Sequence, residues 1–258
     1  MPRRVPRCLT LWAVGVYLFL YVPLFVLMAF SFTPSEYSLR WQGLTWRWYQ
    51  AVWQNQPIQE ALVVSLLVTI PAVLIATAIG TLTALGLHRA RFPGQALVQA
   101  LLYIPLIMPS LVMGVSLLLL FVAVHLPLGI LTMILAHVAF SIPLTTLVML
   151  ARMQRLDPRL EEAAMDLGAD EWTTFWRITL PLLRPGLIAA ALLAFPWSFN
   201  DFVLTFFVAG VGSSTVPLRV YSMIRVGVSP MVNALGTLMV ILPLVVALLG
   251  LRLARRQV

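Results

Sequence analysis

The sequence predicts an all-α integral membrane protein with six transmembrane helices. Of its 258 residues, 61% are apolar and only 10% are charged, and the mean hydropathy is +0.96. Soluble domains have roughly half their residues apolar and about a quarter charged, so this chain has too few polar side chains to cover a surface in water. Six apolar runs each reach the length of about 20 residues that a helix needs to cross the hydrocarbon core of a bilayer.

The six runs divide the chain into spans and hydrophilic segments. Spans are expected at 9–30, 61–87, 97–124, 128–150, 187–208 and 234–251. The gap at 125–127 is so short that the third and fourth spans should be neighbouring antiparallel helices. The hydrophilic segments are 31–60, 151–186 and 209–233, and none is long enough for a soluble domain. We therefore expect a single transmembrane domain over residues 1–258.

The basic residues predict the orientation in the membrane. All 17 are Arg, and the net charge is +8. Thirteen fall on one side of the predicted spans, and only Arg40, Arg47, Arg219 and Arg225 fall on the other. By the positive-inside rule the side with thirteen is cytoplasmic, which places both termini inside and explains the charge without nucleic acid. The basic N-terminus resembles the start of a signal peptide, but the apolar run after it exceeds 20 residues without an A-x-A site, so we expect it to remain as a span.

Cysteine and histidine usage argues against an enzyme or a metal protein. The lone Cys8 excludes an internal disulfide and any multi-cysteine metal site, and the three His residues form no HExxH motif. His88, His125 and His137 are expected at different depths in the membrane, so no catalytic constellation is expected. We interpret His137, in the middle of a span, as a hydrogen-bonding residue between packed helices.

The segment 151–186 differs sharply from the rest of the chain, because it carries five Arg and six acidic residues. Asp157 and Pro158 predict a helix start, with Pro158 at the first helical position. An apolar stripe of Leu160, Ala163, Ala164 and Leu167 follows at helical spacing, and Gly168 should end the helix. Asp170 should cap a second short helix, which Pro181 and Pro185 should stop before the next span. The first helix suits either a groove on another protein or the membrane headgroups.

The same segment carries the spacing E-A-A-x3-G-x9-I-x-L-P, formed by Glu162, Ala163, Ala164, Gly168, Ile178, Leu180 and Pro181. It resembles the signature loop of the membrane-spanning subunits of binding-protein-dependent ABC importers. The resemblance implies a type I importer permease (MetI-like) fold and a coupling helix that docks on a separate ATPase. Glu162 would be the charged contact, Ala163 and Ala164 the tightly packed face, and Gly168 the bend. The chain has no GxxxxGK[ST] motif, so ATP and Mg are expected in the partner and no cofactor in this chain.

The fifth predicted span contains Trp197, Ser198, Asn200 and Asp201, which we take as candidates for a substrate path. Asp201 is the only acidic residue inside a predicted span. A carboxylate at such a place costs at least about 2.5 kcal/mol on insertion scales and usually faces a partner or a water-filled path. It would be a counter-charge for a passing cation, or else a structural partner of an Arg, or interfacial if the span ends early. Prolines inside the spans are compatible with a path or with kinked packing helices: Pro71, Pro105, Pro109, Pro143, Pro196 and Pro243.

A narrower resemblance concerns the C-terminal third. Residues 198–201, 217–230 and 233–235 are similar to the permease subunits of spermidine/putrescine importers. This implies polyamine transport across the bacterial inner membrane by alternating access, with a second permease, two ATPase subunits and a substrate-binding protein as partners. Family members frequently carry two consecutive acids where this chain has Asn200 and Asp201, so an importer for a sugar, an amino acid or ferric iron remains the alternative. A scaffold without transport is disfavoured by the complete signature loop.

Two outer segments are also expected to meet partners or the membrane surface. The segment Arg219–Pro230 would contact the binding protein or cover the path. Aromatic residues in 31–60 would form an interfacial belt, or contact a partner or the substrate: Trp41, Trp46, Trp48, Tyr49 and Trp53.

Overall fold

The computed structural model describes residues 7–36 and 43–255, and all regular elements in these ranges are helices. The chain forms two compact units, which we describe separately. One comprises residues 1–59 with 219–241, and the other comprises 60–218 with 242–258. The expectation of a single domain stays a prediction.

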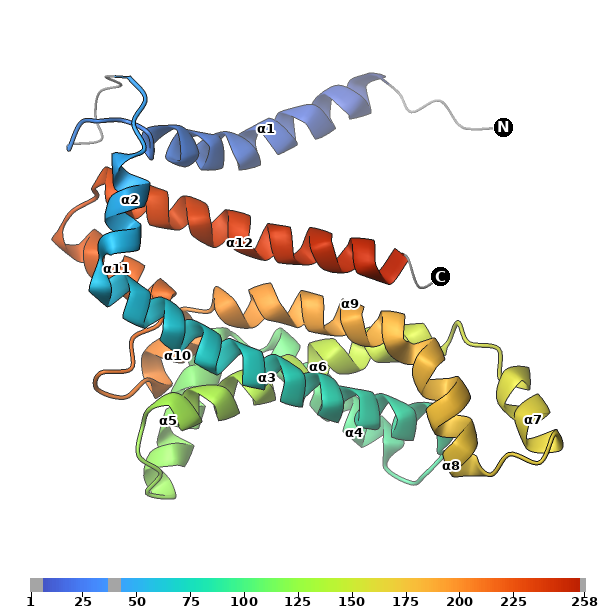
Figure 1. Ribbon diagram of the computed structural model, residues 1–258. Coiled ribbons are helices and arrows are strands. Elements are labelled where there is room, and N and C mark those ends of the chain that lie inside the picture. Colours follow the sequence, from blue (N-terminus) through green and yellow to red (C-terminus); the bar gives the residue numbers. More distant parts are fainter. Residues whose placement is uncertain (1–6, 37–42, 256–258) are drawn as a thin grey trace. The chain divides into compact units, whose positions relative to one another are not determined.

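Four predicted spans appear as single long helices: α1 (Arg7–Phe30), α3 (Gln56–Arg89), α6 (Ile130–Met153) and α12 (Pro230–Arg255). A fifth long helix is the continuous run of α8 (Glu171–Thr174), the π-helical turn η1 (Phe175–Thr179) and α9 (Leu180–Phe199) (Figure 1). These five are long and apolar enough to cross a membrane within the described residues, and a bent pair of helices brings the number to six if it counts as one span. The shorter helices are α2 (Arg47–Gln54), α7 (Arg159–Asp166), α10 (Val203–Val208) and α11 (Val216–Val226).

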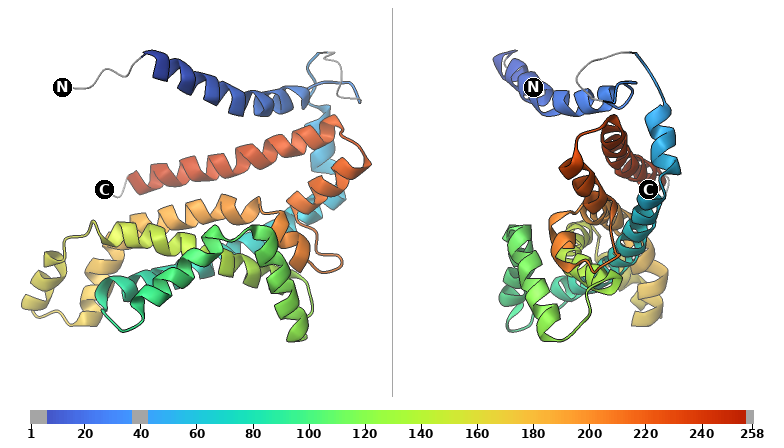
Figure 2. Two further views of the ribbon diagram at one scale, coloured as in Figure 1. Left: turned by 180° about the vertical axis from the view of Figure 1, so that it is seen from behind. Right: turned by 90° about the vertical axis from the view of Figure 1, so that its left-hand side faces the viewer.

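The third predicted span is not one helix, so the expectation of a continuous helix over 97–124 is wrong. It consists of α4 (Gln95–Ile107) and α5 (Ser110–Ala123), and the chain bends by 109° between them. Pro109 causes the break, because a proline disfavours the helical conformation in the residue before it. That residue, Met108, is extended with φ −67° and ψ 132°. Both helices pack against α6, as expected for neighbouring elements, and the sharp turn is visible in Figure 2.

The fifth predicted span begins earlier than expected, because Pro181 and Pro185 do not stop the short helix before it. The helix runs without interruption from Glu171 to Phe199. Its π-helical turn precedes the first proline, and the Leu180 N–H bonds to the Phe175 carbonyl five residues back. Pro181 directly follows this turn, where the hydrogen-bond register of the helix is irregular and a residue without an N–H is tolerated.

The same span also ends earlier than expected. α9 stops at Phe199, Asn200 has φ −92° and ψ 1°, and the short helix α10 starts at Val203. Asp201 therefore lies in a break between two helices and not inside a continuous span, which corrects the expectation for this residue.

The larger unit has its apolar core around α6. Met133, Ala136 and Phe140 of α6 are buried against residues of α3, α5 and α10. α3 crosses α6 closely at Gly80, where an added Cβ would lie 2.2 Å from Thr145 Oγ1. The Thr145 hydroxyl donates a 2.8 Å hydrogen bond to the Ala76 carbonyl across the same contact. α3, α6 and α9 thus form the frame that positions the polar residues described below.

In the smaller unit, one predicted belt residue has a structural role. Trp48 on α2 is buried, and its Nε1 donates a 2.7 Å hydrogen bond to the Thr33 carbonyl. Trp48 therefore anchors α2 to the segment after α1. Trp46 and Trp53 are exposed at 67% and 74%, which suits an interfacial position, and Trp41 lies outside the described residues.

Candidate functional site

The loop between α6 and α9 starts with the short helix α7. This helix begins at Arg159, one residue later than expected, and Pro158 is its N-cap and not its first helical residue. The Asp157 Oδ1 accepts a 3.1 Å hydrogen bond from the Arg159 N–H. The predicted role of Asp157 at this helix start is therefore confirmed, with the boundary shifted.

Gly168 ends α7, as the sequence predicts. Its φ is +93°, a left-handed value that favours glycine. The Gly168 N–H donates to the Met165 carbonyl at 2.9 Å, and the Ala169 N–H donates to the Ala164 carbonyl at 3.0 Å. These two bonds form a Schellman motif, which satisfies the last carbonyls of a helix. Gly168 thereby sets the turn between α7 and α8.

Asp170 caps α8, also as predicted. Its Oδ1 accepts a 3.0 Å hydrogen bond from the Thr173 N–H. Hydrogen bonds from the side chain and then the backbone N–H of Thr173 hold the pKa of Asp170 below its usual value, because they favour the ionised carboxylate.

The signature residues divide into an open group and a packed group. Glu162 and Ala163 are exposed on α7, and Leu167 at its end is 90% exposed. Ala164 is only 8% exposed, so it packs inside this chain and does not share an open face with Ala163. The last three signature residues are half-buried in η1 and the first turn of α9: Ile178, Leu180 and Pro181.

Sequence reasoning missed the residue that fastens α7 to the rest of the unit, Glu161. The Thr179 Oγ1 donates a hydrogen bond of 2.6 Å to Glu161 Oε1, and Arg89 Nη2 donates one of 2.5 Å to the same oxygen. Arg89 is the last residue of α3, and Thr179 is the last of η1. The pairing could not be found from the sequence, because 72 residues separate Arg89 from Glu161.

The second candidate site is the break between α9 and α10, where Asp201 caps α10. Its Oδ2 accepts hydrogen bonds from the Thr205 N–H at 2.9 Å and from Thr205 Oγ1 at 3.1 Å. The Leu204 N–H approaches Oδ1 at 3.5 Å. A carboxylate that accepts the free N–H groups of a helix start stabilises that start, so Asp201 explains why a new helix begins here.

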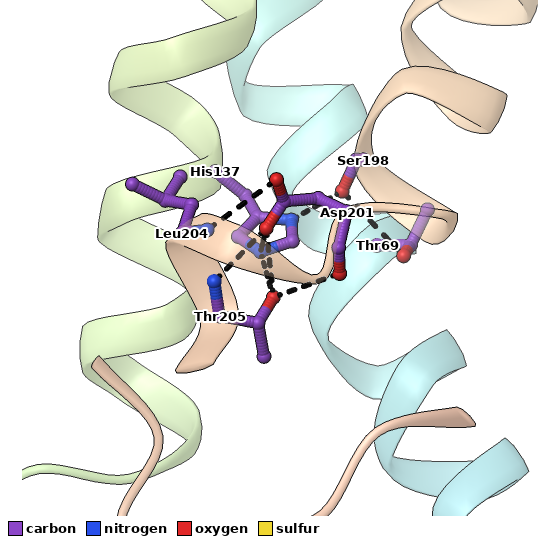
Figure 3. Close-up of polar contacts among 6 residues, drawn as sticks. All are labelled: Thr69, His137, Ser198, Asp201, Leu204 and Thr205. Carbon is purple, nitrogen blue, oxygen red and sulfur yellow. Dashed lines mark hydrogen bonds and ion pairs between the residues drawn. The ribbon is translucent and has the colours of Figure 1, made fainter. Parts of the chain in front are cut away.

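His137 joins this break to α6. Its Nδ1 lies 2.7 Å from Ser198 Oγ and its Nε2 lies 2.9 Å from Thr205 Oγ1, while Asp201 Oδ2 is 3.8 Å from Nε2 (Figure 3). Ser198 Oγ also approaches Thr69 Oγ1 of α3 at 3.5 Å. The prediction of His137 as a hydrogen bonder between helices is confirmed. Among the described residues, the basic side chain within 4 Å of the Asp201 carboxylate is this histidine and not an arginine.

The four predicted path residues therefore fall into two pairs. Ser198 is buried and the Asp201 side chain is only 8% exposed, and both belong to the hydrogen-bonded cluster. Asn200 is exposed, and Trp197 is 42% exposed with its ring stacked on Phe140 at a centroid distance of 5.2 Å. Trp197 and Asn200 are therefore exposed, whereas Ser198 and Asp201 lie inside the hydrogen-bonded cluster.

Comparison with known proteins places the chain in a family. Residues 76–258 match the family described as binding-protein-dependent transport system inner membrane component. The chain is 40% identical over 242 residues to the spermidine/putrescine transport system permease protein PotC of Haemophilus influenzae, covering 94% of each chain. It is 38% identical to PotC of Escherichia coli, covering 93% and 91%, and 40% identical to the putrescine transport system permease protein PotI of Escherichia coli, covering 85% and 81%.

Solved structures agree on the fold. A bacterial ABC transporter involved in the import of alginate superposes with a TM-score of 0.75 over 97% of this chain and 94% of its own, at 18% identity. The MetNI methionine transporter superposes with a TM-score of 0.66 over 80% and 100%, at 20% identity. The family match and the similarity to these permeases, on this fold, define a permease subunit of an ABC importer. The chain belongs to the family of binding-protein-dependent transport system inner membrane components and is a multi-pass protein of the inner membrane.

Proposed function

We propose that this chain is a permease subunit of an ABC importer for polyamines, which moves putrescine or spermidine into the cell by alternating access. The observation that carries the proposal is the similarity of 38–40% identity, over most of the chain, to permeases named for spermidine and putrescine. The exposed coupling loop supports the part of the proposal that concerns ATP.

The coupling loop is the proposed contact with one of the two ATPase subunits of the complex. Glu162 and Ala163 are open on α7, and the exposed Leu167 adds an apolar contact at its end. ATP and Mg belong to those partners, so this chain supplies no catalytic residue and needs no cofactor of its own. Gly168 sets the angle between α7 and α8, and Ala164 with the half-buried Ile178, Leu180 and Pro181 seats the loop on its own unit.

The break between α9 and α10 is the proposed wall of the path. A linear polyamine carries several positive charges separated by apolar segments. The indole face of Trp197 attracts a cation, and the Asn200 side chain supplies an acceptor for its N–H groups. Asp201 contributes negative charge from just behind this surface while it caps α10, and Ser198 holds the end of α9 against His137. A carboxylate at membrane depth is expected near a cation path.

The remaining assignments follow from topology. The thirteen Arg residues on one side of the spans support a cytoplasmic position for the coupling loop and both termini. By resemblance to the spermidine/putrescine importers, the second half of the membrane complex is a related permease, which makes a heterodimer. A substrate-binding protein docks on the outer segment Arg219–Pro230, which lines a hollow of about 480 Å³ together with Glu36. Loss of binding-protein capture after deletion of this segment supports the docking, and unchanged capture contradicts it.

The test is uptake of radiolabelled putrescine and spermidine by the assembled complex, with two substitutions of Asp201. Asp201→Asn removes the charge but keeps an oxygen that can accept the Thr205 N–H, whereas Asp201→Ala removes both. The proposal predicts that Asp201→Asn assembles and hydrolyses ATP but loses most uptake. Full uptake by Asp201→Asn, with poor assembly of Asp201→Ala, would reduce Asp201 to a helix cap. An assembled wild-type complex that takes up no polyamine would leave the permease assignment and redirect the substrate to a sugar, an amino acid or ferric iron.

A further inference from the structure

The coupling helix α7 has little apolar packing on its own chain. Of its eight residues, Ala164 is the buried one, while Leu160 and Met165 are 48% and 44% exposed. Most helical stability in proteins comes from the packing of an apolar face. One buried alanine is too small a face to hold α7 firmly. The position of α7 must therefore depend on its polar contacts.

Those contacts converge on one carboxylate. Glu161 Oε1 accepts from Thr179 Oγ1 and from Arg89 Nη2, and Arg89 Nη2 also lies 3.3 Å from Thr179 Oγ1. The three side chains form a closed ring that joins α7, the end of α3 and the π-helical turn before α9. Thr179 is 2% exposed, whereas the Glu161 and Arg89 side chains are 29% and 46% exposed.

The helix ends favour this arrangement. Glu161 stands in the first turn of α7, and Arg89 stands in the last turn of α3. An anion near a helix N-terminus and a cation near a C-terminus are each stabilised by the helix dipole. A hollow of about 420 Å³ lies beside the ring, with His88, Met153, Gln154, Leu156, Asp157 and Leu183 among its lining residues. The ring therefore holds α7 across a space that side chains do not fill.

We propose that the Arg89–Glu161–Thr179 ring is the latch that transmits movement of α7 to α3 and α9. This role rests on the proposed function of α7 as the helix that docks on the ATPase. Glu161 is a positioning residue, distinct from the exposed Glu162 that faces the partner. Along the chain α7 is joined to the spans only through residues 154–158 and through the turn at Gly168. The latch adds a direct connection to both neighbouring helices, so α7 and the spans move as one body.

α6 is connected to α9 in a comparable way. At the end of α6, Arg152 donates from Nε and Nη2 to the Leu182 carbonyl at 3.1 and 2.7 Å. The cytoplasmic end of α6 is therefore already fixed to α9 by its own arginine. The latch connects α3 and α7 to the turn before α9 in the same way. The ends of α3, α6 and α9 nearest α7 are therefore connected to one another.

The first test uses Arg89→Gln, with Arg91→Gln as the matched control. The two substitutions remove the same charge two residues apart, and Arg91 is exposed without an ion pair among the described residues. In the reconstituted complex, the latch predicts that Arg89→Gln retains assembly and ATP hydrolysis but transports several-fold less substrate per ATP. Arg91→Gln should match wild type. Equal transport per ATP in the two variants would overturn the latch.

A second measurement separates the latch from folding and from the substrate assignment. Hydrogen exchange of residues 159–166 in the purified permease needs no substrate. Exchange should rise roughly fivefold in Arg89→Gln, which corresponds to the upper range for a partly exposed ion pair, and not in Arg91→Gln.

The pair of substitutions Arg89→Glu and Glu161→Arg should restore part of the transport per ATP lost in either alone. Faster exchange without any loss of coupling would make the ring merely structural and overturn the proposal. A wild-type complex that stays assembled but moves no polyamine would instead refute the proposed substrate, and ATP hydrolysis stimulated by the binding protein would then report the coupling.

Discussion

The close crossing of α3 and α6 at Gly80 predicts a clear difference between two glycines of one helix. A Cβ at Gly80 would lie 2.2 Å from Thr145 Oγ1 and 2.9 Å from the Thr146 backbone N, whereas a Cβ at Gly86 meets nothing within 4 Å. Ordinary contacts start near 3.4 Å. Gly80→Ala therefore forces the two helices apart by about 1 Å, while Gly86→Ala does not.

The cost of Gly80→Ala in stability depends on which neighbouring atoms can move. Thr145 Oγ1 can turn away only by giving up its 2.8 Å bond to the Ala76 carbonyl, and the Thr146 N–H belongs to the backbone and cannot rotate. Overpacking of this kind costs roughly 1–3 kcal/mol. Gly86→Ala should instead be neutral or stabilising by up to about 1 kcal/mol, because alanine favours the helix.

The assay is thermal unfolding of the purified permease in detergent. A change of 1 kcal/mol shifts Tm by roughly 2–4 °C in a chain of this size, so Gly80→Ala should melt several degrees below wild type and Gly86→Ala at or above it. Equal Tm values for the two variants would refute the close crossing and, with it, the frame that holds His137 against α9.

Three further results are expected. Gly168→Ala has room for its Cβ, but the left-handed φ of +93° costs an alanine roughly 1–2 kcal/mol. Hydrogen exchange at this turn should therefore rise several-fold, and it should rise less in Gly168→Asn, because asparagine tolerates this conformation better. An unchanged exchange rate would contradict the turn geometry. The pKa of Asp170 is lowered in the folded state, so its stabilising cap is fully present above the usual pKa of about 3.9 and is lost as pH falls through the lower folded pKa. Hydrogen exchange of the Thr173 amide should therefore become equal in wild type and Asp170→Ala only in strong acid. Equal exchange at neutral pH would contradict the cap. His137→Leu removes the 2.7 Å partner of Ser198 Oγ, which keeps only the 3.5 Å approach to Thr69, while Thr205 Oγ1 keeps its bond to Asp201. The loss costs about 1–3 kcal/mol, so Tm should fall, and an unchanged Tm would show that the histidine does not stabilise the unit.

Sequence reasoning succeeded where a residue acts through its own backbone neighbours. Gly168 and Asp170 fix a helix end and a helix start by contacts within four residues, so their types alone predicted both. The long apolar runs were equally readable, because a helix in lipid satisfies its own backbone groups.

The errors concern prolines, whose effect depends on their neighbours. Pro109 breaks a span, while Pro181 lies inside a continuous helix, directly after a π-helical turn. Nothing in the composition distinguishes the two cases. Asp201 was selected correctly as an unusual acidic residue, but its place at the start of α10 depends on bonds to Thr205 and on the ring of His137, which no local pattern reveals.

The coupling loop illustrates the same limit. The motif drew attention to Glu162, which is exposed, and passed over Glu161, whose partners Arg89 and Thr179 are 72 and 18 residues away. A pattern of spacing records what a loop shares with a family. It does not record which of two adjacent carboxylates turns inward to hold the loop in place.

ATP-dependent uptake by proteoliposomes that contain this permease with its partner subunits tests the central claim most directly. Labelled putrescine and spermidine would be supplied with the substrate-binding protein, in parallel with a sugar, methionine and ferric iron. We predict that putrescine or spermidine accumulates in the vesicles, that the other solutes do not, and that accumulation stops when ATP is withheld. Accumulation of another solute, with no polyamine uptake by the fully assembled complex, would contradict the proposed function.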